Sequence, residues 1–305
     1  MVGFSSDQTP QVCFELEAIK RFADRHKLDA TVYTGLYKFD LPYNLNLVTK
    51  DFYLQECVRI DQHHTALSYN PKKSCYDVNL IEKKFISING RRDGIRDLVC
   101  NFLLDTDCVM SYNKSKVEFL ITKNSKDVLR NFYLKNIQSR ICFDVNKINA
   151  NIDIKKFEKR VLDIDVNEMQ HEDLFFDSPI PEVHYKCFCS IVTESKFFYP
   201  YGHFADKILS AIKMCRPFVV FSSPYTLEYA HSLGFKSFSD FWDESYDTET
   251  DHLVRFNKIL DVIRYIDSFS LTELKNMYKE MLPILQHNFD QLGRINNEEA
   301  LLHIQ

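Results

Sequence analysis

Strand-like segments alternate with helix-like segments along most of this 305-residue chain, and this alternation limits the possible folds more than any other feature. The strand-like segments are short and β-rich, and the helix-like segments carry apolar residues at helical spacing. Two units of strand, helix and strand are KKFISI (83–88), GIRDLVCNFLL (94–104) and CVMSYN (108–113), then HYKCFCSIVTES (184–195), HFADKILSAIKM (203–214) and PFVVFSS (217–223). Such alternation predicts a parallel sheet and an α/β fold.

Local signals mark where several other helices begin and end. Ser223 is the expected N-cap of a helix whose first residue is Pro224, and Gly234 lies just past its end. A long C-terminal helix is expected from Ser270, which forms a capping box with Glu273. Further segments expected from periodicity are helices over 11–28, 126–141 and 251–266 and a strand over 29–37.

Composition is typical of a folded protein without a general affinity for nucleic acid. The chain is 45% hydrophobic and 27% charged, which is enough to bury a sizeable core. Its 38 basic residues are outnumbered by 43 acidic ones, and a net charge of -5 does not favour sequence-independent nucleic-acid binding. No apolar run approaches the roughly 20 residues that span a bilayer, and the N-terminus lacks the features of a signal peptide. We therefore expect a cytoplasmic protein with no membrane span.

The nine cysteines are odd in number and lie mostly inside apolar runs, which suggests reduced thiols. Cys187 and Cys189 would point to the same face of a strand. No second pair with zinc-ligand spacing accompanies them, so buried thiols are favoured over a metal site.

Two junctions between a strand and a helix could bind an anion. In an open parallel sheet, ligands lie at the carboxyl ends of the strands, where helix N-termini attract negative charge. Asp206 and Lys207 stand side by side at the start of one predicted helix. A lysine there can hold a diphosphate and a carboxylate can accept ribose hydroxyls, while the competing interpretation is an ordinary first-turn acid beside a solvated lysine.

The second junction is ISINGRRDGIR (86–96), where a strand ends, Asn89 and Gly90 make a turn, and three arginines gather as a helix starts. Guanidinium groups suit phosphate oxygens, although arginines on a solvated helix start give the same pattern. The chain contains neither GxxxxGK[ST] nor GxGxxG, so P-loop and dinucleotide-binding interpretations have no motif to support them.

Three segments of the chain resemble, in the right order, the donor-binding region of the α-1,3-fucosyltransferase family. They are ISINGRRDGIRDLVCNFLLDTDCVMSYN, VTESKFFYPYGHFADKILSAIKMCRPFVVFSSPYTL and SLGFKSFSDFWDESYDTETDHLVRFNKILDVI, and the last is more similar to the fucosyltransferase-like proteins of large phages and other viruses. Together they cover about half of the chain. The resemblance implies a GT-B glycosyltransferase with two Rossmann-like subdomains of parallel sheet and C-terminal helices.

The resemblance also implies roles for individual residues. Glu194 falls on the family's glutamate near the reacting sugar, and Lys207 on its diphosphate-binding lysine. Asp206 replaces the glutamate expected to hold the ribose, Ala205 replaces a threonine, and Ser195 replaces an asparagine. These departures leave the donor open: guanosine diphosphate sugars are favoured by analogy, and uridine diphosphate sugars remain a possibility.

The arginine-bearing turn would complete the donor site. Arg96 is favoured for the phosphate position, with Arg91 and Arg92 not excluded, and Asn89 is expected beside them. No cofactor is implied other than the nucleotide sugar, and no obligatory metal. Glycosyl transfer develops negative charge on the departing diphosphate, so fixed cations stabilise its transition state.

These expectations give a leading function and two alternatives. The chain would be an inverting, metal-independent glycosyltransferase that moves a sugar to a hydroxyl acceptor on a glycan or another molecule. Residues 1–82 would form the acceptor side, 83–268 the donor subdomain, and 269–305 a C-terminal helix and tail. The alternatives are a non-catalytic binding module on the same fold, and a glycosyltransferase that modifies viral DNA bases, with Lys83, Lys84, Arg91 and Arg92 along a groove.

The resemblance implies that the catalytic base comes from the N-terminal part of the chain. RIDQHHTALSYN (59–70) reads as a loop in which Asp61 lies close to His63 and His64, and Asp61 is the candidate base. A solvated loop with incidental histidines explains the same residues.

Two acidic segments are further candidate sites. Asp105-Thr106-Asp107 matches a DxD metal motif, but a loop from helix to strand lies on the wrong side of a parallel sheet for the donor. FWDESYDTETD (241–251) is expected to cap the donor half, with Glu244 or Tyr246 as possible ligand contacts and surface acid as the alternative.

Overall fold

The structure is a computed structural model. It describes residues 20–27, 31–34, 46–49, 76–89, 94–111, 144, 147–148, 181–194, 196–204 and 206–302.

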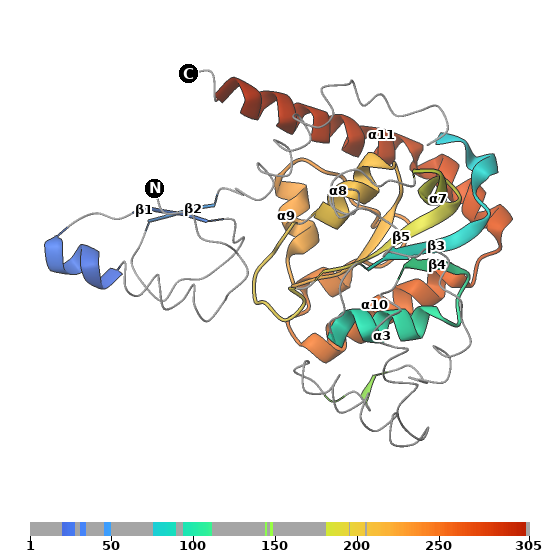
Figure 1. The fold of residues 1–305 in the computed structure, drawn as a ribbon, viewed down its shortest axis with the longest axis horizontal. Coiled ribbons are helices and arrows are strands. Elements are labelled where there is room, and N and C mark those ends of the chain that lie inside the picture. Colours follow the sequence, from blue (N-terminus) through green and yellow to red (C-terminus); the bar gives the residue numbers. More distant parts are fainter. Residues whose placement is uncertain are drawn as a thin grey trace.

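The centre of the molecule is a four-stranded, entirely parallel sheet with the strand order β4-β3-β5-β6 (Figure 1). Its strands are β3 (Lys83–Ile88), β4 (Cys108–Ser111), β5 (Cys187–Thr193) and β6 (Phe218–Phe221). All seven residues of β5 are buried, as expected for a central strand covered on both faces. A separate pair of parallel strands, β1 (Thr31–Thr34) and β2 (Asn46–Thr49), lies in the N-terminal part of the chain. The α/β class expected from the alternating pattern is confirmed.

Helices cover the four-stranded sheet. They are α3 (Gly94–Leu103), α7 (Pro181–Tyr185), α8 (Asp206–Lys213), α9 (Thr226–Ser232), α10 (His252–Asp267) and α11 (Leu271–Leu302), with the short 3₁₀ turns η2 (Val78–Leu80) and η4 (Ser245–Thr248). None of the helices among these described residues is long and apolar enough to cross a membrane.

The two connections that carry α3 and α8 run in opposite directions from the middle of the sheet. Right-handed crossovers of opposite direction place their helices on opposite faces. Accordingly, α3 lies with α10, where Arg264 stacks 5.2 Å from the ring centre of Phe102, and α8 lies with α11, where the Tyr278 hydroxyl donates to the Cys215 carbonyl at 2.7 Å (Figure 1). The result is a three-layer arrangement of helix, sheet and helix.

Segments outside the expected donor subdomain also pack on this body. Cys215 Sγ lies 3.3 Å from the hydroxyl of Tyr76, upstream of β3. In α11, Tyr278 is fully buried and its ring contacts Phe188 of β5 edge to face. The C-terminal helix is therefore part of the same hydrophobic core as the sheet.

The start of α9 differs from the expectation. The helix begins at Thr226, not at Pro224, and Tyr225 precedes it with a left-handed φ of 65°. Its cap is the carboxylate of Asp247 in η4, which accepts from the main-chain N–H groups of Leu227 and Glu228 at 2.8 and 2.9 Å. The expected N-cap, Ser223, instead accepts a hydrogen bond from Thr226 Oγ1 through its carbonyl, at 2.9 Å.

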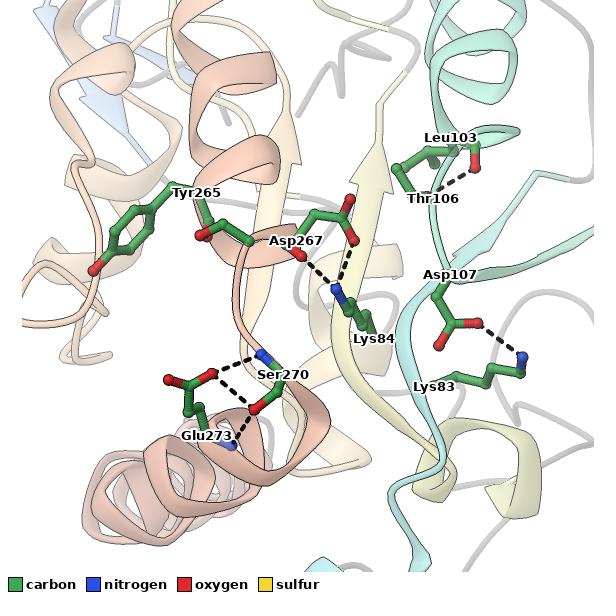
Figure 2. Close-up of polar contacts among 10 residues, drawn as sticks. Lys83, Lys84, Leu103, Thr106, Asp107, Tyr265, Asp267, Ser270 and Glu273 are labelled. Carbon is green, nitrogen blue, oxygen red and sulfur yellow. Dashed lines mark hydrogen bonds and ion pairs between the residues drawn. The ribbon is translucent and has the colours of Figure 1, made fainter.

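Other local predictions agree with the structure. Gly234 adopts φ +87° just past α9, and Phe235 N–H donates back to the Ala230 carbonyl, which is the pattern of a Schellman ending. The capping box is present (Figure 2): Ser270 N–H donates to Glu273 Oε2 at 2.8 Å, and Glu273 N–H to Ser270 Oγ at 3.3 Å. The strand expected from residue 184 begins only at Cys187, because the preceding residues form α7.

The cysteines that the structure describes are buried thiols that form no disulfide with one another. They are Cys100, Cys108, Cys187, Cys189 and Cys215. Burial raises the pKa of the Cys189 thiol far above its ordinary value, so this thiol stays protonated. The expectation of buried thiols is confirmed for these five residues.

Candidate functional site

The strand order creates a topological switch point between β3 and β5. From β3 the chain crosses to β4 on one side, and from β5 it crosses to β6 on the other. In open parallel sheets, ligands bind at the carboxyl ends of the two strands that flank such a point. Here those ends are marked by Asn89, directly after β3, and by Thr193 and Glu194 at the end of β5.

Lys207 and Glu194 meet at this edge. Lys207 lies in the first turn of α8, and its Nζ is 3.8 Å from Oε2 of Glu194, which follows β5 directly. The Glu194 side chain is only 4% exposed and that of Lys207 is 26% exposed. A carboxylate so deeply buried requires a compensating cation, and Lys207 provides one.

Arg96 brings a second cation to the switch point. It lies in the first turn of α3, is 3% exposed, and donates from Nε to the Thr193 carbonyl at 3.3 Å. This hydrogen bond joins the helix after β3 to the end of β5. Asn89, directly after β3, is also buried, and its Nδ2 donates to Ser87 Oγ at 3.0 Å and contacts Cys100 Sγ at 3.4 Å. The amide of Asn89 thus packs between β3 and α3.

Two further residues of this edge were not found from the sequence, namely Lys196 and His203. Both are 5% exposed. Burial, followed by the positive charges of Lys196 and Lys207, lowers the pKa of His203 to about 3. His203 is therefore neutral near pH 7, and an imidazole in that state both donates and accepts hydrogen bonds. Lys196 is buried two residues after Glu194, and its charge acts with that of Lys207 on the same imidazole, so we group the two lysines with His203.

The sequence signal for these two residues was weak. Lys196 follows a strand and His203 precedes a helix, which are common positions for solvated residues. Their burial follows from the loop between β5 and α8, whose fold no local pattern specifies. We call Arg96, Glu194, Lys196, His203 and Lys207 the carboxyl-edge cluster.

The N-terminus of α9 lies at the same edge of the sheet but is already occupied. The carboxylate of Asp247 accepts from two of its main-chain N–H groups, and burial raises the pKa of this carboxyl group. An intramolecular anion thus takes the place that a phosphate would use. Of the helices that follow β3, β5 and β6, α3 and α8 are the ones whose first turns carry cations of the cluster.

Several residues expected at the site cannot be placed. Asp61, Arg91 and Ser195 lie outside the described residues, as does Arg92. Asp206 is the first residue of α8, but only its backbone belongs to the described part. Their assigned roles stay predictions.

The opposite edge of the sheet holds the DxD segment, as its position between α3 and β4 predicts (Figure 2). Asp107 accepts from Lys83 Nζ at 2.8 Å, and Thr106 Oγ1 donates to the Leu103 carbonyl at 2.8 Å. In the part of the chain that the structure describes, no three His, Cys, Asp or Glu side chains gather as metal ligands.

Lys83 and Lys84, expected along a nucleic-acid groove, also lie at this amino-terminal edge. Lys84 Nζ pairs with Asp267 Oδ1 at 3.1 Å and also donates to the Asp267 carbonyl (Figure 2). Both lysines thus have acidic partners within the fold. This arrangement does not add to the case for a nucleic-acid surface.

The acidic segment 241–251 is a structured cap, as expected. Tyr246 is 2% exposed, and Glu244 Oε1 accepts from the Phe238 main-chain N–H at 3.1 Å. Burial raises the pKa of Glu244 to about 7. The Glu244 contact is with a residue just before the segment, and neither Glu244 nor Tyr246 forms a hydrogen bond or ion pair with the carboxyl-edge cluster in the described part of the chain.

Fold and site together define an α/β protein with an electropositive cluster at the switch point of a parallel sheet. Comparison of the chain with protein-family models, with curated proteins and with solved structures found no match. The function is therefore argued from the cluster itself.

Proposed function

We propose that this protein is an inverting, metal-independent glycosyltransferase that transfers a sugar from a nucleoside-diphosphate sugar to a hydroxyl acceptor. The observation that carries the proposal is the meeting of Lys207 and Glu194 beside Arg96 at the switch point. The proposed GT-B arrangement would add a second Rossmann-like subdomain, on the acceptor side, from the N-terminal part of the chain.

The charges of the cluster suit a diphosphate. Arg96, Lys196 and Lys207 contribute three positive charges and Glu194 one negative charge, which leaves a net charge of about +2 with His203 neutral. A nucleoside-diphosphate sugar carries two negative charges on its phosphates. Lys207 and Arg96 would hold the diphosphate, with Arg91 and Asn89 nearby, and Asp206 and Ser195 would contact the nucleoside.

The same groups support the chemistry of transfer. The acceptor oxygen attacks the anomeric carbon, the bond from this carbon to the diphosphate oxygen breaks, and the acceptor proton goes to a base. Negative charge then grows on the leaving diphosphate, where lysine and arginine stabilise it, and positive charge grows on the sugar ring, where Glu194 would stabilise it. A buried carboxylate 3.8 Å from Lys207 can serve this second purpose, because diphosphate bound to the lysine brings the sugar to its side.

Asp61 remains the proposed base, supplied from the N-terminal part of the chain. Guanosine diphosphate sugars are the proposed donors, ahead of uridine diphosphate sugars. Neither assignment rests on a described contact, and both are open to direct tests.

The first test is a thermal-shift screen with EDTA present. The ligands are guanosine, uridine, cytidine, adenosine and thymidine diphosphates and their common sugar conjugates. A ligand that binds only the native state raises the melting temperature, by an amount that grows with concentration over Kd. We expect one nucleotide class to stabilise the wild type, and Lys207→Met to lose the effect. Lys213→Met, at the other end of α8, is the matched control and should keep it.

The outcomes separate the candidates. Stabilisation without metal that depends on Lys207, followed by sugar transfer to an acceptor, supports the proposal. Stabilisation without hydrolysis or transfer across an acceptor panel would indicate the non-catalytic binding module. No stabilisation by any nucleotide, or stabilisation that survives Lys207→Met unchanged, would overturn the assignment of this cluster as a donor site.

A further inference from the structure

Arg255, in the first turns of α10, is a fully buried arginine that binds main-chain atoms of separate segments. It is 1% exposed, and its Nε donates to the Ser222 carbonyl at 3.1 Å. Its Nη1 donates to the Glu249 carbonyl at 2.8 Å, and its Nη2 donates to the Phe197 carbonyl and lies 3.0 Å from His252 Nδ1. One guanidinium thus joins the loop after β5, the loop after β6 and the turn before α10.

Arg255 is held by main-chain carbonyls and an imidazole. In the described part of the chain, no carboxylate forms an ion pair with it. Burial lowers the pKa of Arg255 to about 10, although the negative charges of Asp247, Glu249 and Asp251 act in the opposite direction. A fork of several N–H groups is what allows one side chain to hold several carbonyls at once.

The loop that Arg255 holds carries Lys196. The Phe197 carbonyl belongs to the next residue, and the Phe197 ring lies under the guanidinium, 4.4 Å from ring centre to Cζ. Phe197 is fully buried and also packs edge to face on Phe256 of α10. On its other side, Tyr199 N–H donates to the Lys196 carbonyl at 3.1 Å. Contacts with α10 therefore help to fix the backbone next to Lys196.

The second loop that Arg255 holds leads into α9. The Ser222 side chain accepts from Thr226 Oγ1 at 3.0 Å, and Thr226 Oγ1 lies 3.4 Å from the main-chain N–H of His203. Arg255 thus acts on the backbone next to Lys196 and, through Ser222 and Thr226, on the backbone of His203. Both residues belong to the carboxyl-edge cluster.

We propose that Arg255 is a positioning residue that sets Lys196 for anion binding, so that α10 controls the affinity of the carboxyl-edge cluster for a diphosphate. The inference rests on the proposed function in one respect only, the binding of a diphosphate at this cluster. Arg255 is buried and acts through the Phe197 carbonyl and ring rather than by touching the ligand. Lys196 then joins Lys207 and Arg96 as a ligand-binding cation.

A double-mutant cycle tests the inference, with inorganic pyrophosphate as the probe and Kd measured by calorimetry. Arg255→Lys keeps a positive charge but loses the fork, and we expect it to weaken pyrophosphate binding about tenfold, the factor for one well-placed charge-assisted contact. In a Lys196→Met background the same change should alter Kd less than about twofold, because the positioned group is gone. In a Lys207→Met background the tenfold effect should remain.

Different failures have different meanings. If the wild type does not bind pyrophosphate, the proposed function fails, and the positioning role with it. If the wild type binds and Lys207→Met weakens binding, but Arg255→Lys acts equally in both lysine backgrounds, the proposed function stands and the positioning role is wrong. A general loosening of the fold would give this second result.

A milder variant covers the case in which Arg255→Lys does not fold. Phe197→Leu removes the ring under the guanidinium and keeps the carbonyl to which Arg255 donates. We expect it to weaken pyrophosphate binding about threefold, because the contact between the guanidinium and the ring is lost while the hydrogen bond to the carbonyl remains. The loss should again vanish in the Lys196→Met background, and an equal loss there would contradict the proposal.

Discussion

Glu244 should make the stability of this protein fall as the pH rises from about 4.5 to about 7. Burial raises the pKa of its carboxyl group from 4.5 to about 7. Between these values the folded state keeps a proton that the unfolded state has lost, so the free energy of unfolding decreases with rising pH. Each unit of pKa shift changes the free energy of unfolding by about 1.4 kcal/mol. The rise of the Glu244 pKa from 4.5 to about 7 therefore lowers the free energy of unfolding by roughly 3 kcal/mol at most once the pH exceeds 7.

Glu244→Gln removes this titration and keeps an oxygen that can accept from the Phe238 N–H. We expect the variant to be about as stable as the wild type at pH 4.5 and more stable by roughly 2 to 3 kcal/mol at pH 8, because no buried charge forms. Urea denaturation of both proteins across this pH range measures the difference between their free energies of unfolding. The contributions of the other titrating groups are the same in both proteins and cancel in this difference. Glu280→Gln, on the exposed face of α11, is the matched control and should show no such trend.

The reasoning would be refuted by a stability difference between Glu244→Gln and the wild type that is the same at pH 5 and pH 8. A difference that grows as the pH falls would refute it more strongly, because it would mean that the folded state favours the ionised carboxylate.

Two further predictions concern the ends of α9. Asp247→Ala leaves a buried and a partly buried N–H group of that helix without their acceptor and should lower the free energy of unfolding by about 2 kcal/mol in urea denaturation. Asp261→Ala, at an exposed site on α10, should change it by less than about 0.5 kcal/mol. Gly234→Ala forces an alanine into φ +87° and brings its Cβ to 2.7 Å from Gln291 Nε2, so a loss of about 1 to 2 kcal/mol is expected. Gly293→Ala, where an added Cβ meets nothing within 4 Å inside α11, should instead be neutral or stabilising, and equal losses at both glycines would contradict the argument.

The elements that could be predicted were those with strong local signals. The strand over 83–88 and the helix over 94–104 match β3 and α3 within one residue, and the helix over 251–266 matches α10. Apolar periodicity and capping residues act over a few positions, so they can be read directly from the chain. The start of α9 was predicted wrongly because its cap, Asp247, lies 20 residues away from the N–H group that it binds.

The candidate site was predicted in part. Lys207, Glu194 and Arg96 were named from the sequence, and the structure brings all three to one edge of the sheet. Lys196 and His203 were missed, since their burial depends on the loop between β5 and α8. Arg255 had a visible signal, because it shares a helical face with Ile259, Val262 and Ile266, all buried. A charged residue on an apolar stripe is a candidate for a buried hydrogen-bonding role.

The sequence by itself determined the class of the fold and placed cations in the first turns of two helices. Both are local properties, because they depend on the alternation of strands and helices and on the residues of each first turn. Only the tertiary structure decided that β3 and β5 are neighbours, and therefore that Arg96 and Lys207 lie at one edge of the sheet and the DxD segment at the other. It also decided which helix N-terminus is already capped, and which arginine holds the loops around the cluster. These properties depend on contacts between segments far apart in the chain, and the free energy of such contacts is set by burial that no short stretch of sequence specifies.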